Sequence, residues 1–448
     1  MQTASFIAEK IVGHNTAQTT ADVSNPGQDG GKYGEPNEKM LALVWQGKGK
    51  VEVVETSKPK LIDARDAIVR VTGSTICGSD LHLLHSAIMQ LKPGDILGHE
   101  FCGVVESAGP EAEANGLKVG QRVVASFQIA CGSCKYCKEG LSSMCANTNP
   151  AGVPEAMWGN STSGFFGYSH MTGGYAGGQA EYVRVPFGDV NLLPLPDDVP
   201  DEKGLYLSDV LATAYHSVVD TGVEAGNNVA VWGAGPIGLF VAYFAFKKGG
   251  KRVILIDDVQ WRLDWAKHKL PNVEVLNFGE LARGESVTKA LHERVPGGWD
   301  VCIDAVGGEY SKGWGHAIEI SLGAETDSSE IINEMITSTR HFGRCGLIAA
   351  YAGFTNHVNV GSLMERGIRL IGNGQAPVHK YWKELLAQIQ SGELDPTIML
   401  SHRVKLEDTA KAYYKFEARD PKVRMMKTFI ETKASAPRLE HTPILSAA

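Results

Sequence analysis

A glycine-rich turn between two apolar segments constrains the fold more than any other feature of this chain. The segment NNVAVWGAGPIGLFVAYFAFKKGG indicates a buried strand, a turn and a helix. The next strand, RVILIDD, brings Asp257 nineteen positions after the last glycine of the turn. A lone G-x-G-x-x-G would be weak evidence among 51 glycines, but this order of elements is typical of a dinucleotide-binding βαβ unit.

The glycines of the turn have separate expected roles. Gly233 allows the tight turn, Gly235 lets the backbone approach a pyrophosphate, and Gly238 lets the helix lie close to the strand. The predicted cofactor-binding residues of the turn are Gly233, Gly235, Pro236, Ile237 and Gly238.

The acidic residue after the second strand indicates which dinucleotide is bound. Asp257 is expected to accept hydrogen bonds from the adenosine ribose hydroxyls and to repel a 2′-phosphate, which favours NAD(H) over NADP(H). Arg262 lies near enough in the sequence to keep NADP(H) open, although a solvated helix charge is the simpler interpretation of that residue.

Strand-like and helical segments alternate from this unit to Asn373. The strand-like segments are VEVLNF, WDVCIDAVG, FGRCGLIAAY and IRLIGN. This alternation predicts an α/β fold with a doubly wound parallel sheet, of the Rossmann type, over residues 206–374. One departure is a polar helical stretch at 311–341, which is longer than a minimal crossover.

The segments on either side predict a second domain. Short runs from Met40 onward, such as MLALVW, VEVVE and DAIVRVT, are typical of strands in an irregular β-barrel-like domain over residues 40–205. Residues 375–432, with two helical patterns and the strand-like VRMMKTFIET, are expected to return to it. A helical pattern runs from about Glu202 to Val219, and a Gly- and aromatic-rich loop at 146–180 is expected to shape a pocket or an interface.

Composition and the chain ends narrow the function classes. A net charge of −8 without an arginine-rich or lysine-rich run argues against a nucleic-acid partner. No apolar stretch approaches the length of about 18 residues that a membrane span needs, and no signal peptide is recognisable. We expect a cytoplasmic protein with a loosely ordered polar arm at 1–39 and a flexible tail at 433–448.

Four of the eight cysteines lie close together, in CGSCKYCKEGLSSMC at 131–145. The spacing C-x2-C-x2-C-x7-C lets one stretch of chain present four thiolates to a tetrahedral ion. Four sulfur ligands would leave no position for a reacting water, so the sequence predicts a structural zinc site. Its ligands would be Cys131, Cys134, Cys137 and Cys145, and a disulfide pair or an iron–sulfur centre is the alternative.

A second group of potential metal ligands occupies residues 77–100. It contains C-G-S-D-L-H from Cys77 to His82 and G-H-E from Gly98 to Glu100. A thiol, imidazoles, a hydroxyl and carboxylates in two dozen positions are what a site needs to hold a divalent metal and to transfer a proton.

With these motifs in this order, residues 40–432 resemble a zinc-dependent medium-chain dehydrogenase/reductase, the superfamily of alcohol dehydrogenases. The sequence is most similar to the branch that contains glutathione-independent formaldehyde dehydrogenase. The resemblance implies a GroES-like catalytic domain and a catalytic zinc held by Cys77 and His99. The third ligand implied is Asp209, in L-S-D-V-L-A-T-A-Y-H, where classical members use cysteine.

The resemblance also assigns roles around this zinc. It implies a proton relay from Ser79 through the nicotinamide ribose to His82, and an orienting contact from Asp80 to His99. Glu100 matches a residue that approaches zinc during ligand exchange, and Phe127 matches an aromatic of the substrate pocket. Taken alone, His82 would be read as a surface or structural residue and Phe127 as part of the core.

The activity implied is hydride transfer between an alcohol or aldehyde and NAD(H), with two Zn²⁺ per chain and a homodimeric or homotetrameric assembly. Alternatives are a polyol-type zinc dehydrogenase and an aldehyde dismutase that holds NAD tightly. Polyol dehydrogenases usually have Glu-Pro where this chain has Asp209 and often lack the four-cysteine lobe. A non-catalytic dinucleotide-binding protein is the alternative from a different class.

Overall fold

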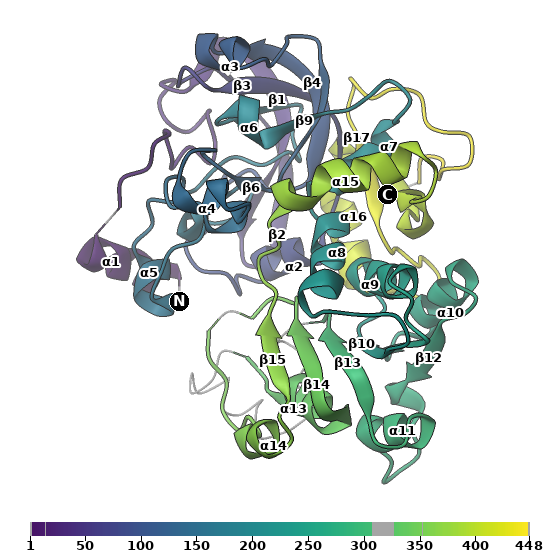
Figure 1. Ribbon diagram of the computed structural model, residues 1–448. Coiled ribbons are helices and arrows are strands. Elements are labelled where there is room, and N and C mark those ends of the chain that lie inside the picture. The colour runs from purple at the N-terminus through teal and green to yellow at the C-terminus, as the bar shows by residue number, and fades with distance from the viewer. Residues whose placement is uncertain (1, 14, 307–326, 352, 447–448) are drawn as a thin grey trace. The chain divides into compact units, whose positions relative to one another are not determined.

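The computed structural model describes residues 2–13, 15–306, 327–351 and 353–446 (Figure 1). The chain forms two compact units. Unit 1 comprises Met1–Ala212 and Pro377–Ala448, and unit 2 comprises Thr213–Ala376. Among the described residues, no helix combines the length and the apolar character that crossing a membrane requires.

Unit 2 is built on a six-stranded sheet in which every pairing is parallel, in the order β12-β11-β10-β13-β14-β15. The strands are β10 (Asn228–Trp232), β11 (Arg252–Asp257), β12 (Glu274–Asn277), β13 (Trp299–Asp304), β14 (Thr339–Leu347) and β15 (Arg369–Gly372). The strand order reverses beside β10, and the glycine-rich turn follows β10 at this switch point. The predicted doubly wound parallel sheet is confirmed.

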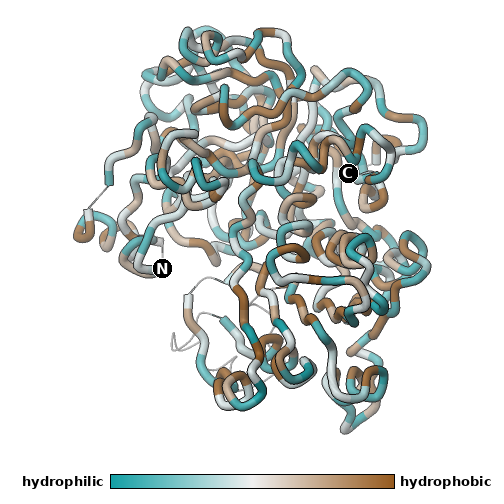
Figure 2. Tube along the Cα trace, in the orientation of Figure 1, coloured by the Kyte–Doolittle hydropathy of each residue, from teal (hydrophilic) through white to brown (hydrophobic). Residues whose placement is uncertain are grey.

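Successive residues of a strand point to opposite faces of the sheet, so helices pack on both faces to bury the apolar side chains. Ala230, Trp232 and Ile254 share a core with residues of α11 (Val287–Arg294) and α13 (Glu330–Ser338). On the other face, Leu255 lies beside the start of α9 (Pro236–Lys247), a mostly hydrophobic helix (Figure 2). The remaining helices of this unit are α10 (Gln260–Lys269) and α14 (Val360–Glu365). Of the helical stretch expected at 311–341, residues 311–326 lie outside the described part.

Unit 1 contains a seven-stranded sheet in the order β16-β17-β3-β4-β5-β9, with β8 also paired to β3. Its strands are β3 (Ala67–Ser74), β4 (Phe101–Ala108), β5 (Arg122–Ala125), β8 (Tyr182–Val185), β9 (Leu192–Pro194), β16 (His402–Lys405) and β17 (Thr428–Glu431). Two antiparallel pairs accompany it: β1 (Gly34–Gly47) with β2 (Lys50–Pro59), and β6 (Gln128–Ile129) with β7 (Gly164–Phe165). Because Ile430 of β17 pairs with Ser74 of β3, the C-terminal segment returns to the sheet of the N-terminal segment.

The helices of unit 1 are α1 (Gln2–Val12), α2 (Gly78–Leu84), α3 (Pro110–Ala114), α4 (Lys135–Lys138), α5 (Val153–Trp158), α6 (Gly188–Asn191), α7 (Asp201–Gly204), α15 (Val378–Gln390) and α16 (Thr409–Glu417). Most of them are short, but α1 has 11 residues and α15 has 13. Helix α8 (Val210–Asp220) begins in unit 1 and continues into unit 2.

The described residues of the arm and of the tail form hydrogen bonds with other parts of unit 1, whereas their polar composition predicted loose ordering. In the arm, the buried Glu9 accepts a hydrogen bond of 2.6 Å from the backbone N–H of Gly152. In the tail, the Leu439 N–H donates to Glu202 over 3.0 Å, and the Ser446 N–H donates to the Arg403 carbonyl over 2.8 Å.

Candidate active site

Four side chains that could bind a metal converge in unit 1. Cys77, His99, Glu100 and Asp209 each offer one ligand atom, and these atoms all lie within 4.8 Å of one another. His99 Nε2 is 3.4 Å from Asp209 Oδ2 and 3.9 Å from Glu100 Oε1. The three residues expected to bind the catalytic zinc therefore come together, with Glu100 beside them.

Local structure positions the first two ligands. Cys77 precedes the first turn of α2, where its N–H donates to Asp80 Oδ2 over 2.9 Å. His99 directly follows Gly98, whose φ of +98° lies in the left-handed region. A Cβ at Gly98 would lie 2.6 Å from the backbone nitrogen of Gln179, so this approach to the ligand requires glycine.

The third ligand lies at a break that the helical pattern of 202–219 did not predict. Helix α7 leads into a 3-10 helix, Leu205–Ser208, and α8 begins only at Val210. Asp209 between them has φ −150° and ψ −74°, outside the helical range. Its carboxylate can therefore point toward His99 from the start of α8.

Asp80 holds the imidazole of His99 from its other side. Asp80 Oδ1 lies 3.3 Å from His99 Nδ1, and Asp80 Oδ2 accepts a hydrogen bond of 3.2 Å from Gln179 Nε2. Gln179 in turn accepts from the Tyr413 hydroxyl over 2.7 Å. This leaves Nε2 of His99 as the nitrogen that faces the cluster, as the carboxylate–histidine–metal arrangement requires.

Glu100 has a partner that sequence reasoning missed. Lys427 Nζ lies 2.6 Å from Glu100 Oε1, and both side chains are almost fully buried. Burial raises the pKa of Glu100, and the charge of Lys427 only partly opposes that rise. Lys427 precedes strand β17 in an apolar run, and nothing in its sequence context signals a contact with a residue 327 positions earlier.

The electrostatics of the cluster fit a bound cation. Burial lowers the pKa of His99, but the charge of Asp80 and the hydrogen bond to Asp209 outweigh burial and raise that pKa well above its ordinary value. Glu100 Oε2 is buried and has no hydrogen-bond partner among the described residues. A thiol, an imidazole and buried carboxylates form a costly arrangement without a cation and a suitable one for Zn²⁺.

Several aromatic side chains lie next to the histidine ligand. The ring of His99 lies edge-on to Phe127 and to Tyr168, with centroid distances of 6.2 Å in both pairs. Phe165 contacts Phe127 at 5.3 Å and Tyr168 at 6.0 Å, which closes a circuit of four rings. We call Phe127, Phe165 and Tyr168 the aromatic wall. Only Phe127 was predicted, but the other two lie in the aromatic-rich loop expected to shape a pocket.

The two residues of the expected proton relay lie on helix α2. Ser79 Oγ is 3.8 Å from Cys77 Sγ, so the hydroxyl lies beside the metal cluster. His82 follows three positions later, which puts it on the same face of the helix as Ser79. Both side chains are partly exposed.

The four-cysteine lobe forms a second potential metal site. Ligand sulfurs of Cys131, Cys134, Cys137 and Cys145 lie within 4.8 Å of one another. Backbone N–H groups of Ser133 and Cys134 donate to the Cys131 sulfur over 3.4 and 3.3 Å. All eight cysteines are free, so the disulfide alternative does not describe this structure. The donor set fits a tetrahedral Zn²⁺.

The glycine-rich turn in unit 2 has the geometry that its sequence predicted. Gly233 has φ +101°, and a Cβ at Gly238 would lie 1.9 Å from the Gly233 carbonyl oxygen. A Cβ at Gly235, in contrast, would meet no described atom within 4 Å, which leaves open space where a pyrophosphate would approach. Asp257 Oδ2 accepts a hydrogen bond of 2.7 Å from the Ala234 N–H, so the carboxylate lies beside the turn.

Arg262, the residue that kept NADP(H) open, lies in α10 shortly after Asp257. Its guanidinium lies over the Trp261 ring, 5.5 Å from the centroid. The Nε atom of Arg262 is buried, so the interpretation of this residue as a solvated helix charge is not confirmed.

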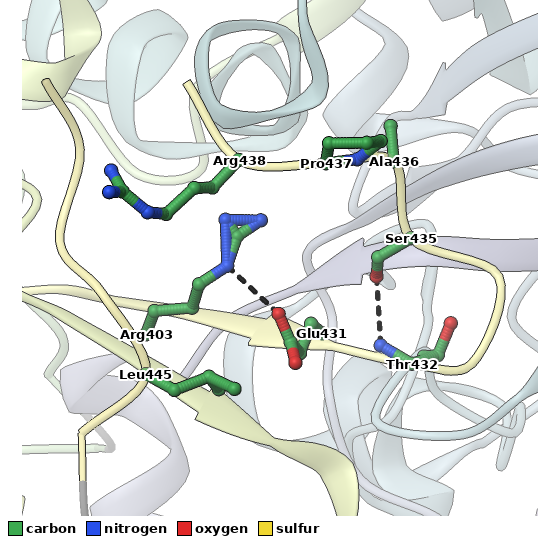
Figure 3. A pocket seen from close by; sticks show the side chains of 8 residues that line it. All are labelled: Arg403, Glu431, Thr432, Ser435, Ala436, Pro437, Arg438 and Leu445. Atoms are coloured by element: carbon green, nitrogen blue, oxygen red, sulfur yellow. Dashed lines mark hydrogen bonds and ion pairs between the residues drawn. The ribbon is translucent and has the colours of Figure 1, made fainter. Parts of the chain in front are cut away.

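A separate cavity lies beneath the C-terminal tail (Figure 3). It has a volume of about 390 Å³, and its charged groups already have partners. Arg403 binds Glu202 over 3.0 Å and Glu431 over 3.0 Å, while Arg438 donates to backbone carbonyls. We therefore place the candidate chemistry at the Cys77–His99–Asp209 cluster.

Comparison with known proteins identifies relatives over nearly the whole chain. Residues 63–197 match the alcohol dehydrogenase GroES-like domain. A zinc-type alcohol dehydrogenase-like protein of Schizosaccharomyces pombe is 36% identical over 410 residues, which cover 91% of this chain and 94% of the relative. A glutathione-independent formaldehyde dehydrogenase of Pseudomonas aeruginosa is 33% identical, with 85% of this chain and 95% of the relative covered.

A solved structure of an alcohol dehydrogenase has a similar fold. An alcohol dehydrogenase from Thermus sp. ATN1 superposes with a TM-score of 0.72 at 31% sequence identity, covering 88% of this chain and 100% of that one. The GroES-like and Rossmann-type architecture expected from the sequence is thus confirmed.

Proposed function

The chain belongs to the zinc-type alcohol dehydrogenases of the medium-chain dehydrogenase/reductase superfamily, and we propose that it transfers a hydride between an alcohol or aldehyde and NAD(H). The observation that carries this proposal is the convergence of Cys77, His99 and Asp209 in one buried cluster. When bound, Zn²⁺ supplies a Lewis acid that lowers the pKa of a substrate hydroxyl, and NAD⁺ supplies the hydride acceptor.

The protein residues hold and orient the reacting groups. Cys77, His99 and Asp209 bind the catalytic zinc, and Asp80 fixes the orientation of His99. Glu100, anchored by Lys427, lies next to the ligands and can approach the metal when a ligand is exchanged. The aromatic wall excludes water from the side of His99, which strengthens the electrostatic interactions within the site.

The substrate proton leaves through residues of helix α2. The Ser79 hydroxyl is both a donor and an acceptor, so it can take the proton and pass it on. His82, on the same face of α2 and partly exposed, would take up the proton and release it to solvent. In aldehyde reduction the same groups deliver a proton.

The remaining parts support this activity. Cys131, Cys134, Cys137 and Cys145 hold a second, structural zinc. Gly233, Gly235, Pro236, Ile237 and Gly238 bind the pyrophosphate of NAD(H) at the start of α9, and Asp257 binds the adenosine ribose.

We further propose a cytoplasmic homo-oligomer. Eight free cysteines are typical of a reducing compartment. Strand β15 is a sheet edge with an exposed Leu370, and Phe342, Val360 and Met364 are exposed in the same unit. Exposed apolar groups beside a sheet edge are a common basis for association with a second copy.

The test is a screen of alcohols and aldehydes with the purified protein, in which NADH absorbance is followed and zinc is measured. We expect about two zinc per chain and NAD-dependent turnover. A protein with zinc only in the cysteine lobe and no turnover would favour the non-catalytic dinucleotide-binding alternative. Nicotinamide that stays bound through desalting would favour a dismutase.

A further inference from the structure

The N-terminal arm contacts the aromatic-rich loop near the beginning and near the end of that loop. The contacts are backbone hydrogen bonds of 2.7 to 3.1 Å: Asn15 to Pro150, Gln18 to Asn147, Asp22 to Gly173 and Ala176 to Val23. A bridge between Val23 and Tyr175 continues this pairing. The loop that carries Phe165 and Tyr168 is therefore bounded by residues from the start of the chain.

Glu9 fastens the arm near the beginning of the loop. This carboxylate is 5% exposed and accepts hydrogen bonds from the N–H groups of Gly152, over 2.6 Å, and Val153, over 3.1 Å. It thus caps the first turn of α5. Gln90 Nε2 donates to Glu9 over 3.1 Å, and the Gln90 carbonyl accepts from the His170 N–H over 3.0 Å. Gln90 is therefore hydrogen-bonded to both Glu9 and His170.

His170 fastens the arm near the end of the loop. Its Nδ1 binds Asp22 of the arm, and its Nε2 lies 3.2 Å from Asp95 Oδ1. The ring of Phe6, also from the arm, lies edge-on to the imidazole at 6.0 Å. The His170 side chain is only 8% exposed, and Lys92 Nζ lies 3.3 Å from its Nδ1, so the two carboxylates balance the positive charge gathered here.

These contacts lead directly to the metal cluster. His170 follows Tyr168 by two residues, and Tyr168 contacts both the ligand His99 and Phe165. Phe165 belongs to β7, which pairs with β6, and the Phe166 N–H donates to the Phe127 carbonyl over 3.1 Å. A shift of His170 would therefore move the aromatic wall relative to His99.

We propose that the first part of the N-terminal arm, residues 2–13 and 15–25, is a positioning element that holds the aromatic wall against His99 and thereby determines which substrates the site accepts. The two fastening points are Glu9 at the start of α5 and Asp22 on His170. The substrate part of this inference rests on the proposed function, whereas the positioning part does not.

The decisive variant is Asp22→Asn, measured in the full-length, zinc-loaded protein. Asp22 has φ +61°, a conformation that asparagine also adopts readily, so the substitution removes charge without backbone strain. We expect hydrogen exchange across residues 164–173 to rise about tenfold, because the hydrogen bond from His170 loses the negative charge of its acceptor. The ratio of kcat/KM between a benzylic and a short straight-chain alcohol should shift by about fivefold or more at unchanged zinc content.

Two controls separate this effect from general damage to the arm. Asp29→Asn makes the same change in a carboxylate that accepts hydrogen bonds of 2.9 Å from the N–H groups of Gly31 and Tyr33 in its own turn. Glu9→Ala tests the other fastening point, and Lys10→Ala, at an exposed neighbour on α1, is its control. Only Asp22→Asn and Glu9→Ala should change exchange in the loop.

Each outcome decides one part of the inference. Unchanged exchange in Asp22→Asn and Glu9→Ala would overturn the positioning role. Faster exchange with an unchanged substrate ratio would reduce the arm to a structural element and overturn its role in specificity. A wild-type protein that turns over no alcohol or aldehyde would instead contradict the proposed function, while the exchange measurement would still decide the positioning role.

Discussion

Lys427 Nζ and Glu100 Oε1 lie 2.6 Å apart, and each of the two side chains is 1% exposed. Replacing Lys427 by methionine leaves the Glu100 carboxylate buried without its counter-charge. We expect the free energy of unfolding to fall by roughly 3–5 kcal/mol, the range found when one partner of a buried ion pair is removed. Urea unfolding followed by circular dichroism measures this loss.

The chain offers a matched control for that variant. Lys433 forms an ion pair with Glu181 over 3.1 Å, but its side chain is 73% exposed. Lys433→Met should leave stability nearly unchanged because solvent screens the pair. If the double variant Lys427→Met/Glu100→Gln were as unstable as Lys427→Met alone, the buried charge would not be the cause.

Cys77→Ala tests the catalytic metal cluster. Loss of one of three ligands should reduce the zinc content from about two to about one per chain and abolish turnover, with the circular dichroism spectrum retained. Elemental analysis of the dialysed protein gives the zinc content. A variant with wild-type rates would show that Cys77 is not a ligand.

Cys134→Ser, in contrast to Cys77→Ala, should affect stability before it affects activity. The cysteine lobe joins residues of unit 1 without a position for substrate, so its disruption should first lower the thermal midpoint or the assembly state. Differential scanning calorimetry and gel filtration report these changes. A normally stable but inactive variant would contradict a purely structural lobe.

Two glycines of the same turn should respond differently to alanine. Gly238→Ala places a Cβ 1.9 Å from the Gly233 carbonyl oxygen and should lower both stability and NADH affinity. Gly235→Ala meets no described atom within 4 Å and should weaken only NADH binding, by obstructing the pyrophosphate. Thermal unfolding and NADH fluorescence titration distinguish the two. Equal losses of stability would contradict the assignment.

His170 should make stability depend on alkaline pH. Burial lowers its pKa, but hydrogen bonds to Asp22 and Asp95 outweigh burial and raise the pKa to about 9 from an ordinary value of 6.5. A raised pKa stabilises the folded state fully below pH 6.5, and this contribution disappears as the pH rises through 9. It amounts to at most about 3.5 kcal/mol, since each pKa unit corresponds to about 1.4 kcal/mol.

The measurement compares unfolding free energies of wild type and His170→Gln between pH 6 and 10. The difference between them should shrink with rising pH, because only the wild type loses a bound proton that favours folding. A difference that stayed constant over this range would show that His170 does not titrate in the folded protein.

Sequence patterns predicted the parts whose geometry is local. Cys77 and Asp80 lie three residues apart at the start of one helix, and His99 lies two residues before strand β4, so short motifs determine their positions. The turn at Gly233 to Gly238 is similarly defined by its own backbone requirements. These features depend on neighbours within a few residues, which a sequence displays directly.

The parts that sequence patterns missed depend on distant contacts or on one backbone angle. Lys427 meets Glu100 across 327 positions, and no periodicity reports such a pairing. The break at Asp209 changes the conformation of a single residue inside an otherwise helical pattern. The polar composition of the arm predicted a loosely ordered segment. Glu9 is nevertheless buried, and it accepts hydrogen bonds from the backbone N–H groups of residues 152 and 153.

The interruption of unit 1 by residues 213–376 has a consequence for synthesis of the chain on the ribosome. The whole of unit 2 emerges before strand β17 has been translated, whereas β3, which pairs with β17, has by then been outside the exit tunnel for hundreds of residues. Domains fold as units in order of emergence, so the nucleotide unit can become native while its companion still exposes an unpaired strand edge. The early half of unit 1 thus completes its sheet only when the last part of the chain has been translated.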